Sequence, residues 1–186
     1  MNYITNPEIE NELQSILSKD EQLIWTGRPR QGVFFRGSDI FMIPFSCMWC
    51  GFAIFWESMA TGHGAPFFST LWGIPFILVG LYMTIGRFFV DAQMRQKTMY
   101  GVTHSRVIIK SGLFNSEIQS LYSKALPEIR IGQNKDGSGT ISFGANDYRS
   151  VMTQGLIWPG VKQQPKLDHI DNAQEVYNLI AEGQRG

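Results

Sequence analysis

Two long runs without a charged residue constrain this chain more than any other feature. Between Ile40 and Gly86 the one charged residue is Glu57, although charges are frequent on both sides of this segment. The first run, Ile40 to Trp56, has 17 residues, and the second, Phe67 to Gly86, has 20. As helices they would reach roughly 25 and 30 Å, against a hydrocarbon core of about 30 Å. The pattern predicts a transmembrane hairpin over residues 40–90, in preference to a buried hairpin of a soluble α-helical protein, whose helices would carry a polar face.

Basic residues lie at only one end of this predicted hairpin. The connection from Glu57 to Pro66 contains no Lys or Arg, whereas the opposite end is flanked by Arg28, Arg30, Arg36, Arg87, Arg95 and Lys97. The positive-inside rule then places both termini in the cytoplasm and the connection outside. The same six residues are candidates for contact with anionic lipid head groups, at about 1 kcal/mol each; the alternative is that they only set the topology. No signal peptide is expected, since no basic segment leads into an apolar run near Met1.

Small residues in the two runs predict close helix packing. These are Gly51 and Ala53 in the first run and Gly73 and Gly80 in the second, and they would join the runs either to each other or to another membrane helix. Cys47 and Cys50 have the spacing of a redox pair. A reactive thiol needs an accessible thiolate, which an apolar environment disfavours. We therefore interpret both cysteines as small packing side chains.

The flanking segments predict a small, mainly β domain with a helix at each end. Asn6-Pro7-Glu8 starts an amphipathic helix, and Leu23-Ile24-Trp25 is a short strand. After the hairpin, one β-rich run is expected over Thr98 to Lys110 and further strands at 114–122, 129–131, 140–143, 151–158 and 167–170. A last helix, capped by Asp171 and ending before Gly183, places Val176, Tyr177 and Ile180 on one apolar stripe. The predicted parts are an N-terminal helix (1–20), a strand and juxtamembrane segment (21–39), the hairpin (40–90) and the β domain (91–186).

Four segments in this order resemble bacterial pleckstrin-homology-domain membrane proteins. They are Glu21 to Pro29 (EQLIWTGRP), Tyr100 to Ile109 (YGVTHSRVII), Gly137 to Gly144 (GSGTISFG) and Ile170 to Tyr177 (IDNAQEVY). Family members usually have Asn where this chain has His104. The resemblance implies a split β-barrel, capped by a C-terminal helix and tethered to the bacterial cytoplasmic membrane by a multi-pass hairpin.

The residue types argue against nucleic-acid binding, a metal site and catalysis. Lys+Arg and Asp+Glu are equal at 16 each, and no basic run suggests nucleic acid as a partner. His63, His104 and His169 lack the spacing of metal ligands, so no metal site is expected. Gly137-Ser138-Gly139 lacks the Lys that a phosphate loop requires, and no nucleophile-elbow pattern is present. We expect no catalytic residues, no cofactor and no enzyme.

Three functions remain open on these grounds. The first is a membrane-anchored binding or scaffold module that holds a protein partner by a sheet edge or by its open end. The second is an accessory subunit of a larger membrane complex, contacted through the hairpin. The third is a sensor of lipid or of a small ligand. Membrane lipid and a protein partner or complex are expected contacts, and a homo-oligomer is compatible with all three.

Overall fold

The protein is described from a computed structural model that covers residues 5–33, 35, 39–64, 66–113, 115–144 and 164–185. Within these residues the chain divides into two compact units. One contains residues 33–91, and the other contains residues 5–32, 92–144 and 164–185. The predicted strand at 151–158 and the basic residue Arg36 lie outside the described residues.

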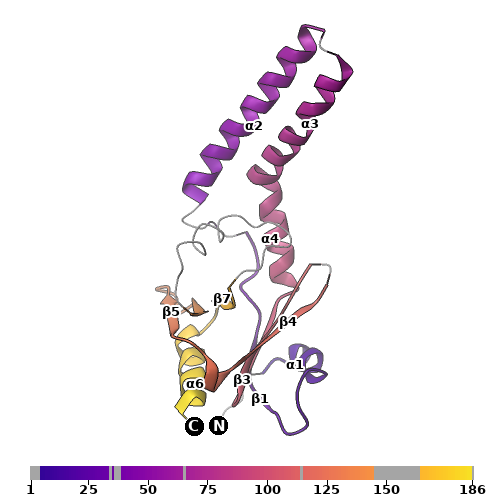
Figure 1. Cartoon of the computed structure of the whole chain (residues 1–186). Helices are drawn as coiled ribbons and strands as arrows, with labels where there is room; N and C mark the ends of the chain where they lie inside the picture. The colour runs from indigo at the N-terminus through magenta and orange to yellow at the C-terminus, as the bar shows by residue number, and fades with distance from the viewer. Residues whose placement is uncertain are drawn as a thin grey trace. The chain divides into compact units, whose positions relative to one another are not determined.

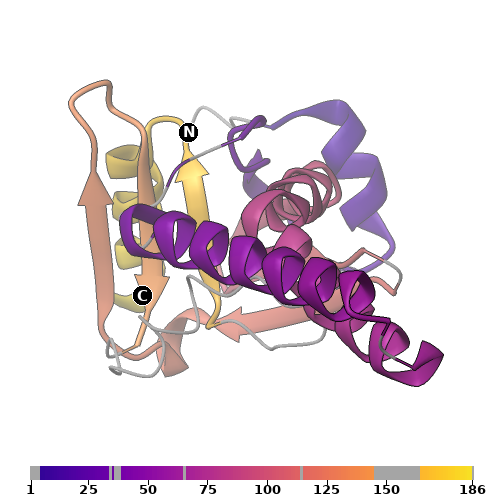
Figure 2. The same ribbon diagram turned by 90° about the horizontal axis from the view of Figure 1, so that it is seen from above.

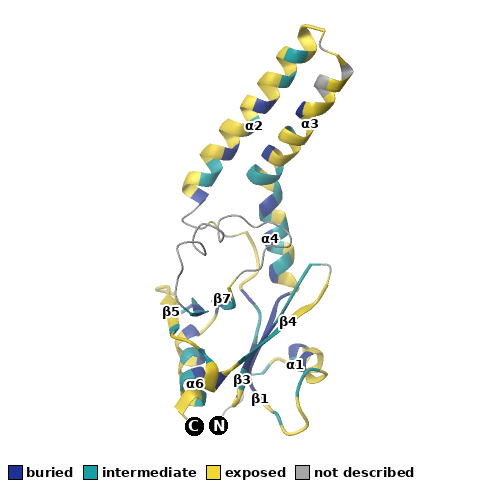
Figure 3. Ribbon diagram, in the orientation of Figure 1, coloured by how far each residue is buried: buried dark blue, intermediate teal, exposed yellow. Residues whose placement is uncertain are grey.

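The first unit is a helical hairpin (Figure 1). Helix α2 (Asp39–Gly62) is followed by α3 (Phe67–Leu81), which continues through the π-helical segment η1 (Tyr82–Gly86) into α4 (Arg87–Gln96). Two stretches, Asp39–Gly62 and Leu71–Gln96, are long and apolar enough to cross a membrane. Only 17% of the most apolar 18-residue part of each is buried. Figure 3 shows exposed residues along most of α2 and α3. This is the pattern of helices that present apolar side chains to lipid.

Helix α2 runs on past Trp56 to Gly62, so the connection predicted from Glu57 to Pro66 begins inside the helix. The predicted connection therefore shrinks to the few residues between Gly62 and Phe67. The Glu57 carboxylate lies in contact with the space that a side chain on Gly73 would fill. Both of its oxygens are buried and have no hydrogen-bond partner among the described residues. A glycine on the facing helix thus accommodates the one charged residue of the apolar segment.

The second unit contains two antiparallel sheets and a C-terminal helix. The first sheet has the order β1 (Leu23–Gly27), β2 (Met99–Thr103), β3 (Arg106–Ser111) and β4 (Glu117–Tyr122); the second has the order β5 (Ile129–Gln133), β6 (Gly139–Phe143) and β7 (Lys166–Ile170). Figure 2 shows α6 (Ala173–Arg185) along the second sheet. These elements confirm a mainly β domain with a C-terminal helix beside two apolar helices.

The hairpin is inserted between two paired strands. Strand β1 precedes it in the chain and β2 follows it, yet they pair antiparallel with Thr26 opposite Gly101. Sequence reasoning placed Leu23 to Trp25 in a strand, and this pairing adds them to the sheet. Residues 21–27 therefore belong to the same compact unit as residues 92–144 and 164–185.

One large core holds the two sheets and α6 together. Its buried side chains come from every strand except β4 and β5, and from α6: Ile24, Trp25, Tyr100, Val102, Val107, Ile109, Ile141, Phe143, Leu167, Ile170, Ala173, Val176 and Ile180. Tyr177 is partly buried against it, as the predicted stripe requires. Helix α6 begins at Ala173, because Asn172 and not Asp171 accepts its first backbone bonds, and it continues past Gly183 to Arg185.

A second, smaller core lies on the other face of the first sheet. Helix α1 (Pro7–Gln14) begins at the predicted cap, where the Asn6 side chain accepts the Glu8 N–H at 3.0 Å. Its Ile9 and Leu13 are buried against a patch that includes Ile108. A Cβ on Gly101 would lie 2.8 Å from a methyl of Leu23 and 2.9 Å from a methyl of Leu13, so a larger residue here would make both side chains shift. The helix ends earlier than its apolar pattern, and Ile16 and Leu17 pack from the segment that follows.

The single run predicted over Thr98 to Lys110 is two strands joined by a tight turn at His104 and Ser105. No glycine or proline marks this turn, which is why the run looked continuous. The Thr103 hydroxyl makes it instead, by accepting the N–H groups of Ser105 at 3.3 Å and Arg106 at 3.0 Å. The predicted turn at 134–139 is confirmed, with Gly137 at a positive φ of 83°.

Candidate functional site

Strand β4 is an open edge of the first sheet. It pairs with β3 on one side, and the described residues place no strand on its other side. Ile118 and Tyr122 are 46% and 60% exposed, and among the described residues outside 33–91 they are the only exposed large apolar side chains. Because alternate residues of a strand share a face, both lie on the face that also carries Ser120. An edge strand with exposed apolar residues is a template for another strand.

The backbone of β4 presents its free hydrogen-bonding groups at the same three residues. The Ser123 N–H donates to the Ser105 carbonyl at 2.8 Å, which continues the β3–β4 register by one pair beyond Arg106 and Tyr122. In an antiparallel ladder, hydrogen-bonded pairs alternate with pairs whose N–H and C=O point away from the neighbour. Tyr122, Ser120 and Ile118 therefore direct these groups outward.

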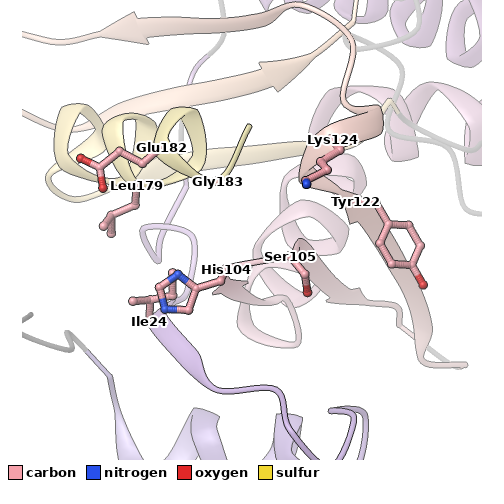
Figure 4. Close-up of a pocket in the computed structure, with 8 residues that line it drawn as sticks. All are labelled: Ile24, His104, Ser105, Tyr122, Lys124, Leu179, Glu182 and Gly183. Atoms are coloured by element: carbon pink, nitrogen blue, oxygen red, sulfur yellow. The ribbon is translucent and has the colours of Figure 1, made fainter. Parts of the chain in front are cut away.

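A pocket of about 530 Å³ adjoins the end of this edge and shares Tyr122 with it. Figure 4 shows its lining, which comes from β1, the turn between β2 and β3, the end of β4, η2 (Ser123–Ala125) and α6: Ile24, His104, Ser105, Tyr122, Lys124, Leu179, Glu182 and Gly183. Gly183 shapes this pocket, since a Cβ there would lie 3.1 Å from the His104 carbonyl oxygen. Although several of these residues are polar, most of the surface that lines the pocket is apolar. Sites for small ligands commonly combine an apolar surface with a few polar groups.

The turn that carries His104 is fixed by a partly buried ion pair. Arg106 donates to Glu21 from Nε at 2.9 Å and from Nη2 at 2.6 Å. Glu21 also accepts the hydroxyls of Thr103 at 2.9 Å and Ser105 at 3.1 Å. The Arg106 bond is the main cause that lowers the pKa of Glu21 to about 2, against the opposing effect of burial. The segment from Thr103 to Arg106 therefore has a structural role, and its second residue, His104, is left exposed at the pocket.

A second buried cluster surrounds Asp168. Its carboxylate lies 3.5 Å from Arg95, 3.4 Å from Lys166 and 3.0 Å from His169. Burial by itself would raise the pKa of Asp168, but the hydrogen bond from His169 and the charges of Lys166 and Arg95 outweigh it and hold the pKa well below its usual range. The backbone N–H of Asp168 donates to the Tyr100 hydroxyl at 3.1 Å. Burial raises the pKa of this phenol above its usual range.

The structure separates the basic residues proposed for lipid contact into two groups. Arg95 is buried beside Asp168, and Arg87 is buried in an ion pair with Asp39 at 2.9 Å. The remaining described members are partly or fully exposed: Arg28 lies 3.4 Å from Glu8, Arg30 lies 2.7 Å from Asp136, and Lys97 donates to the Leu113 carbonyl at 2.6 Å. Asp39 is distant from Arg87 in the chain, and Asp168 is distant from Arg95. Sequence spacing therefore could not identify these ion pairs.

The small residues proposed for helix packing also differ in their surroundings. Gly80 meets Cys50, whose Cβ would lie 2.9 Å from a Cβ placed there, Gly73 meets Glu57, and Ala53 is buried. Gly51, by contrast, has nothing within 4 Å of its missing side chain. Three of the four positions therefore lie where α2 and α3 meet each other. Cys47 and Cys50 are free thiols, of which only Cys47 is fully exposed.

No group of three or more His, Cys, Asp or Glu side chains suited to a metal ion occurs among the residues that the structure describes. The features that stand out are thus the open β4 edge and the adjoining pocket, which no sequence motif marked. An alternation of Ile118, Ser120 and Tyr122 is visible in the sequence, but it does not show which strand of a sheet is outermost. Comparison of the chain with protein-family models, with curated proteins and with solved structures gave no match.

Proposed function

We propose that this chain is a non-enzymatic, membrane-anchored module with a PH-like domain, which holds a protein partner at the cytoplasmic membrane of a bacterium. The observation that carries this proposal is the edge of β4, where exposed apolar side chains and outward backbone groups occur at the same residues. Edges of this kind bind an extended segment by strand addition, with backbone bonds for affinity and side chains for selectivity.

Two features support the PH-like assignment and the anchor. The order of four strands, three strands and a C-terminal helix agrees with the resemblance drawn from the sequence. The apolar hairpin is inserted between β1 and β2, so the domain would be tethered by two adjacent strands instead of one flexible linker. Such a tether favours a module that works beside the bilayer.

Fewer observations support the two alternative functions, an accessory subunit and a sensor. For an accessory subunit that docks through its hairpin, the exposed face around Gly51 remains available, whereas Gly73 and Gly80 are occupied by α2. For a sensor of a small ligand, the pocket beside His104 and Lys124 is the supporting observation. Lipid contact is retained as a proposal for Arg28, Arg30 and Lys97.

The topology is tested by a single cysteine at His63, the first residue after α2, in a chain that carries Cys47→Ala and Cys50→Ala. With both termini in the cytoplasm, this thiol is outside, and a membrane-impermeant maleimide should label it on intact cells. Gln184→Cys, exposed near the end of α6, is the matched control and should react only after lysis. If Gln184→Cys were labelled on intact cells and His63→Cys only after lysis, the orientation in the membrane would be the opposite of the one proposed.

The binding function is tested by placing proline on the edge. Ile118→Pro removes an outward N–H and the exposed side chain, so a protein that co-purifies with the tagged wild type in mild detergent should be lost. Gln133→Pro on the outer edge of β5 is the matched control and should retain it, since the bond between Gly144 N–H and the Glu128 carbonyl leaves the Gln133 N–H outward as well. Equal retention by both variants would exclude β4 as the binding edge.

A further inference from the structure

Of the edges in the two sheets, β4 is the least protected. On the opposite edge of the same sheet, the β1 residues Leu23 to Thr26 are all buried, and the Asn6 N–H donates to the Thr26 hydroxyl at 2.6 Å. On β7, the Arg30 N–H donates to the His169 carbonyl at 2.9 Å. The outer strand β5 carries a charged and exposed Arg130 near its middle. Charged side chains, a covering segment and short length usually protect an edge strand from pairing with another chain. Among these protections, β4 has only the charge of Glu117 at its first position.

We infer that the strand which pairs with β4 is β4 of a second copy of this chain, so that the module is a two-fold symmetric dimer. This inference rests on the proposed function and specifies the partner at the same edge. In a two-fold interface, a residue that opposes another is opposed by it in return. Antiparallel pairing of β4 with β4 of a second copy satisfies this condition, because a two-fold axis between the two strands makes them antiparallel.

The positions of the outward backbone groups select the register. Only Ile118, Ser120 and Tyr122 present N–H and C=O groups to the edge, so these residues must oppose one another. A register centred on Ser120 achieves this for all three, with Ser120 opposite its own copy and Ile118 opposite Tyr122 on both sides of the axis. Each such pair exchanges two backbone hydrogen bonds. A shift by two residues would leave an outward residue of each strand unopposed.

The side chains are complementary in this register. Ile118 and Tyr122 are the exposed large apolar residues among the described residues outside 33–91, at 46% and 60%, and the pairing places each against the other. Aromatic and β-branched side chains directly opposite each other are a favourable cross-strand pair. A strand of different composition would have to supply the same two apolar side chains at the same spacing, whereas a second copy already has them.

Charge also favours a second copy. Glu117 is the one charged residue of β4, and in this register it lies opposite Ser123 of the other copy, next to Lys124. Opposite charges would therefore be close at both ends of the paired strands. The chain has 16 basic and 16 acidic residues, so no overall repulsion opposes the approach of two copies.

The test is disulfide cross-linking of the full-length chain in native membranes, in the Cys47→Ala, Cys50→Ala background. Paired Ser120 residues would have Cα atoms about 5.5 Å apart, within the range of about 4.4 to 6.8 Å that a disulfide spans. Ser120→Cys should form a covalent dimer under mild oxidation. Gln119→Cys is the matched control: it lies on the opposite face of the strand and faces Leu121 of the other copy, so its dimer yield should be lower by at least about tenfold.

A mixed experiment tests the register. Two differently tagged copies, one with Ile118→Cys and one with Tyr122→Cys, should cross-link with each other when expressed together, and neither should form a dimer when expressed alone. Equal yields for Ser120→Cys and Gln119→Cys, or no dimer with Ser120→Cys, would overturn the inference. Loss of a different co-purifying protein in Ile118→Pro, together with no Ser120→Cys dimer, would show that β4 binds another chain, which contradicts the dimer and retains the proposed function.

Discussion

Replacing Glu21 by glutamine is expected to lower the free energy of unfolding of the second unit, which contains the two sheets, by about 2–3 kcal/mol, because it removes the negative charge from a partly buried pair joined by charge-assisted hydrogen bonds. Glutamine keeps the size of the side chain but leaves the Arg106 guanidinium, 12% exposed, without its negative charge. The same change weakens the bonds from Thr103 and Ser105 that define the turn at the pocket. Hydrogen exchange of β2 and β3 in the full-length protein in detergent measures the loss.

Glu128→Gln is the matched control for this experiment. Glu128 also pairs with an arginine, Arg130, at 2.9 Å, but the two side chains are 65% and 45% exposed. Solvent screens an exposed pair, so it contributes little to stability, and this variant should leave the exchange rates nearly unchanged. A similar small effect of Glu21→Gln would mean that the ion pair does not stabilise the turn. The double variant Glu21→Gln, Arg106→Met should recover part of the loss, because it removes the uncompensated charge.

The same carboxylate predicts how stability depends on pH. The pKa of Glu21 is about 2 in the folded protein, against an ordinary value of 4.5. Because the folded pKa is the lower one, the contribution of Glu21 is complete above about pH 4.5 and is lost as the pH falls towards 2, by about 3 kcal/mol in all. Glu21→Gln should flatten this part of the stability profile. Asp168, whose pKa is also depressed, keeps some dependence in the variant.

Local patterns in the sequence predicted most of the elements but not their tertiary partners. The absence of charge identified both apolar helices, and Asn6 identified the start of α1, because each depends on neighbouring residues alone. Glu57 was assigned to the connection between the helices, since nothing in its own neighbourhood shows that Gly73 on the facing helix makes room for it within α2.

The strand that forms the candidate site could not be identified for the same reason: binding by a sheet edge was expected, but the sequence does not show which strand is outermost. Its edge exists because β1, from before the hairpin, occupies the other side of the sheet and leaves β4 outermost. Its pocket exists because the end of α6 meets the turn at His104. Both depend on contacts between residues far apart in the chain. The turn itself was missed because a threonine hydroxyl forms it in place of the glycine or proline on which turn prediction relies.

The second large effect is expected at the C-terminal helix. Ile180 is 1% exposed and packs in the core shared by both sheets. Ile180→Ala should therefore cost about 2–5 kcal/mol, from lost burial and from the cavity left behind. The measurement is again hydrogen exchange in the full-length chain. A fragment that starts at Arg95 would lack β1 and with it Ile24 and Trp25, which belong to the same core, so it would be unstable before any substitution.

The distribution of the loss distinguishes a packed helix from a peripheral one. Because Ile180 belongs to the core that also contains Val107 and Ile141, its truncation should speed exchange in β3 and β6 as well as in α6. Glu175→Ala, at an exposed position of the same helix, is the matched control and should change stability by less than about 0.5 kcal/mol. Faster exchange confined to α6 would mean that the helix only covers the domain, whereas loss of protection in both sheets makes it part of the single folding unit that positions the pocket and the β4 edge.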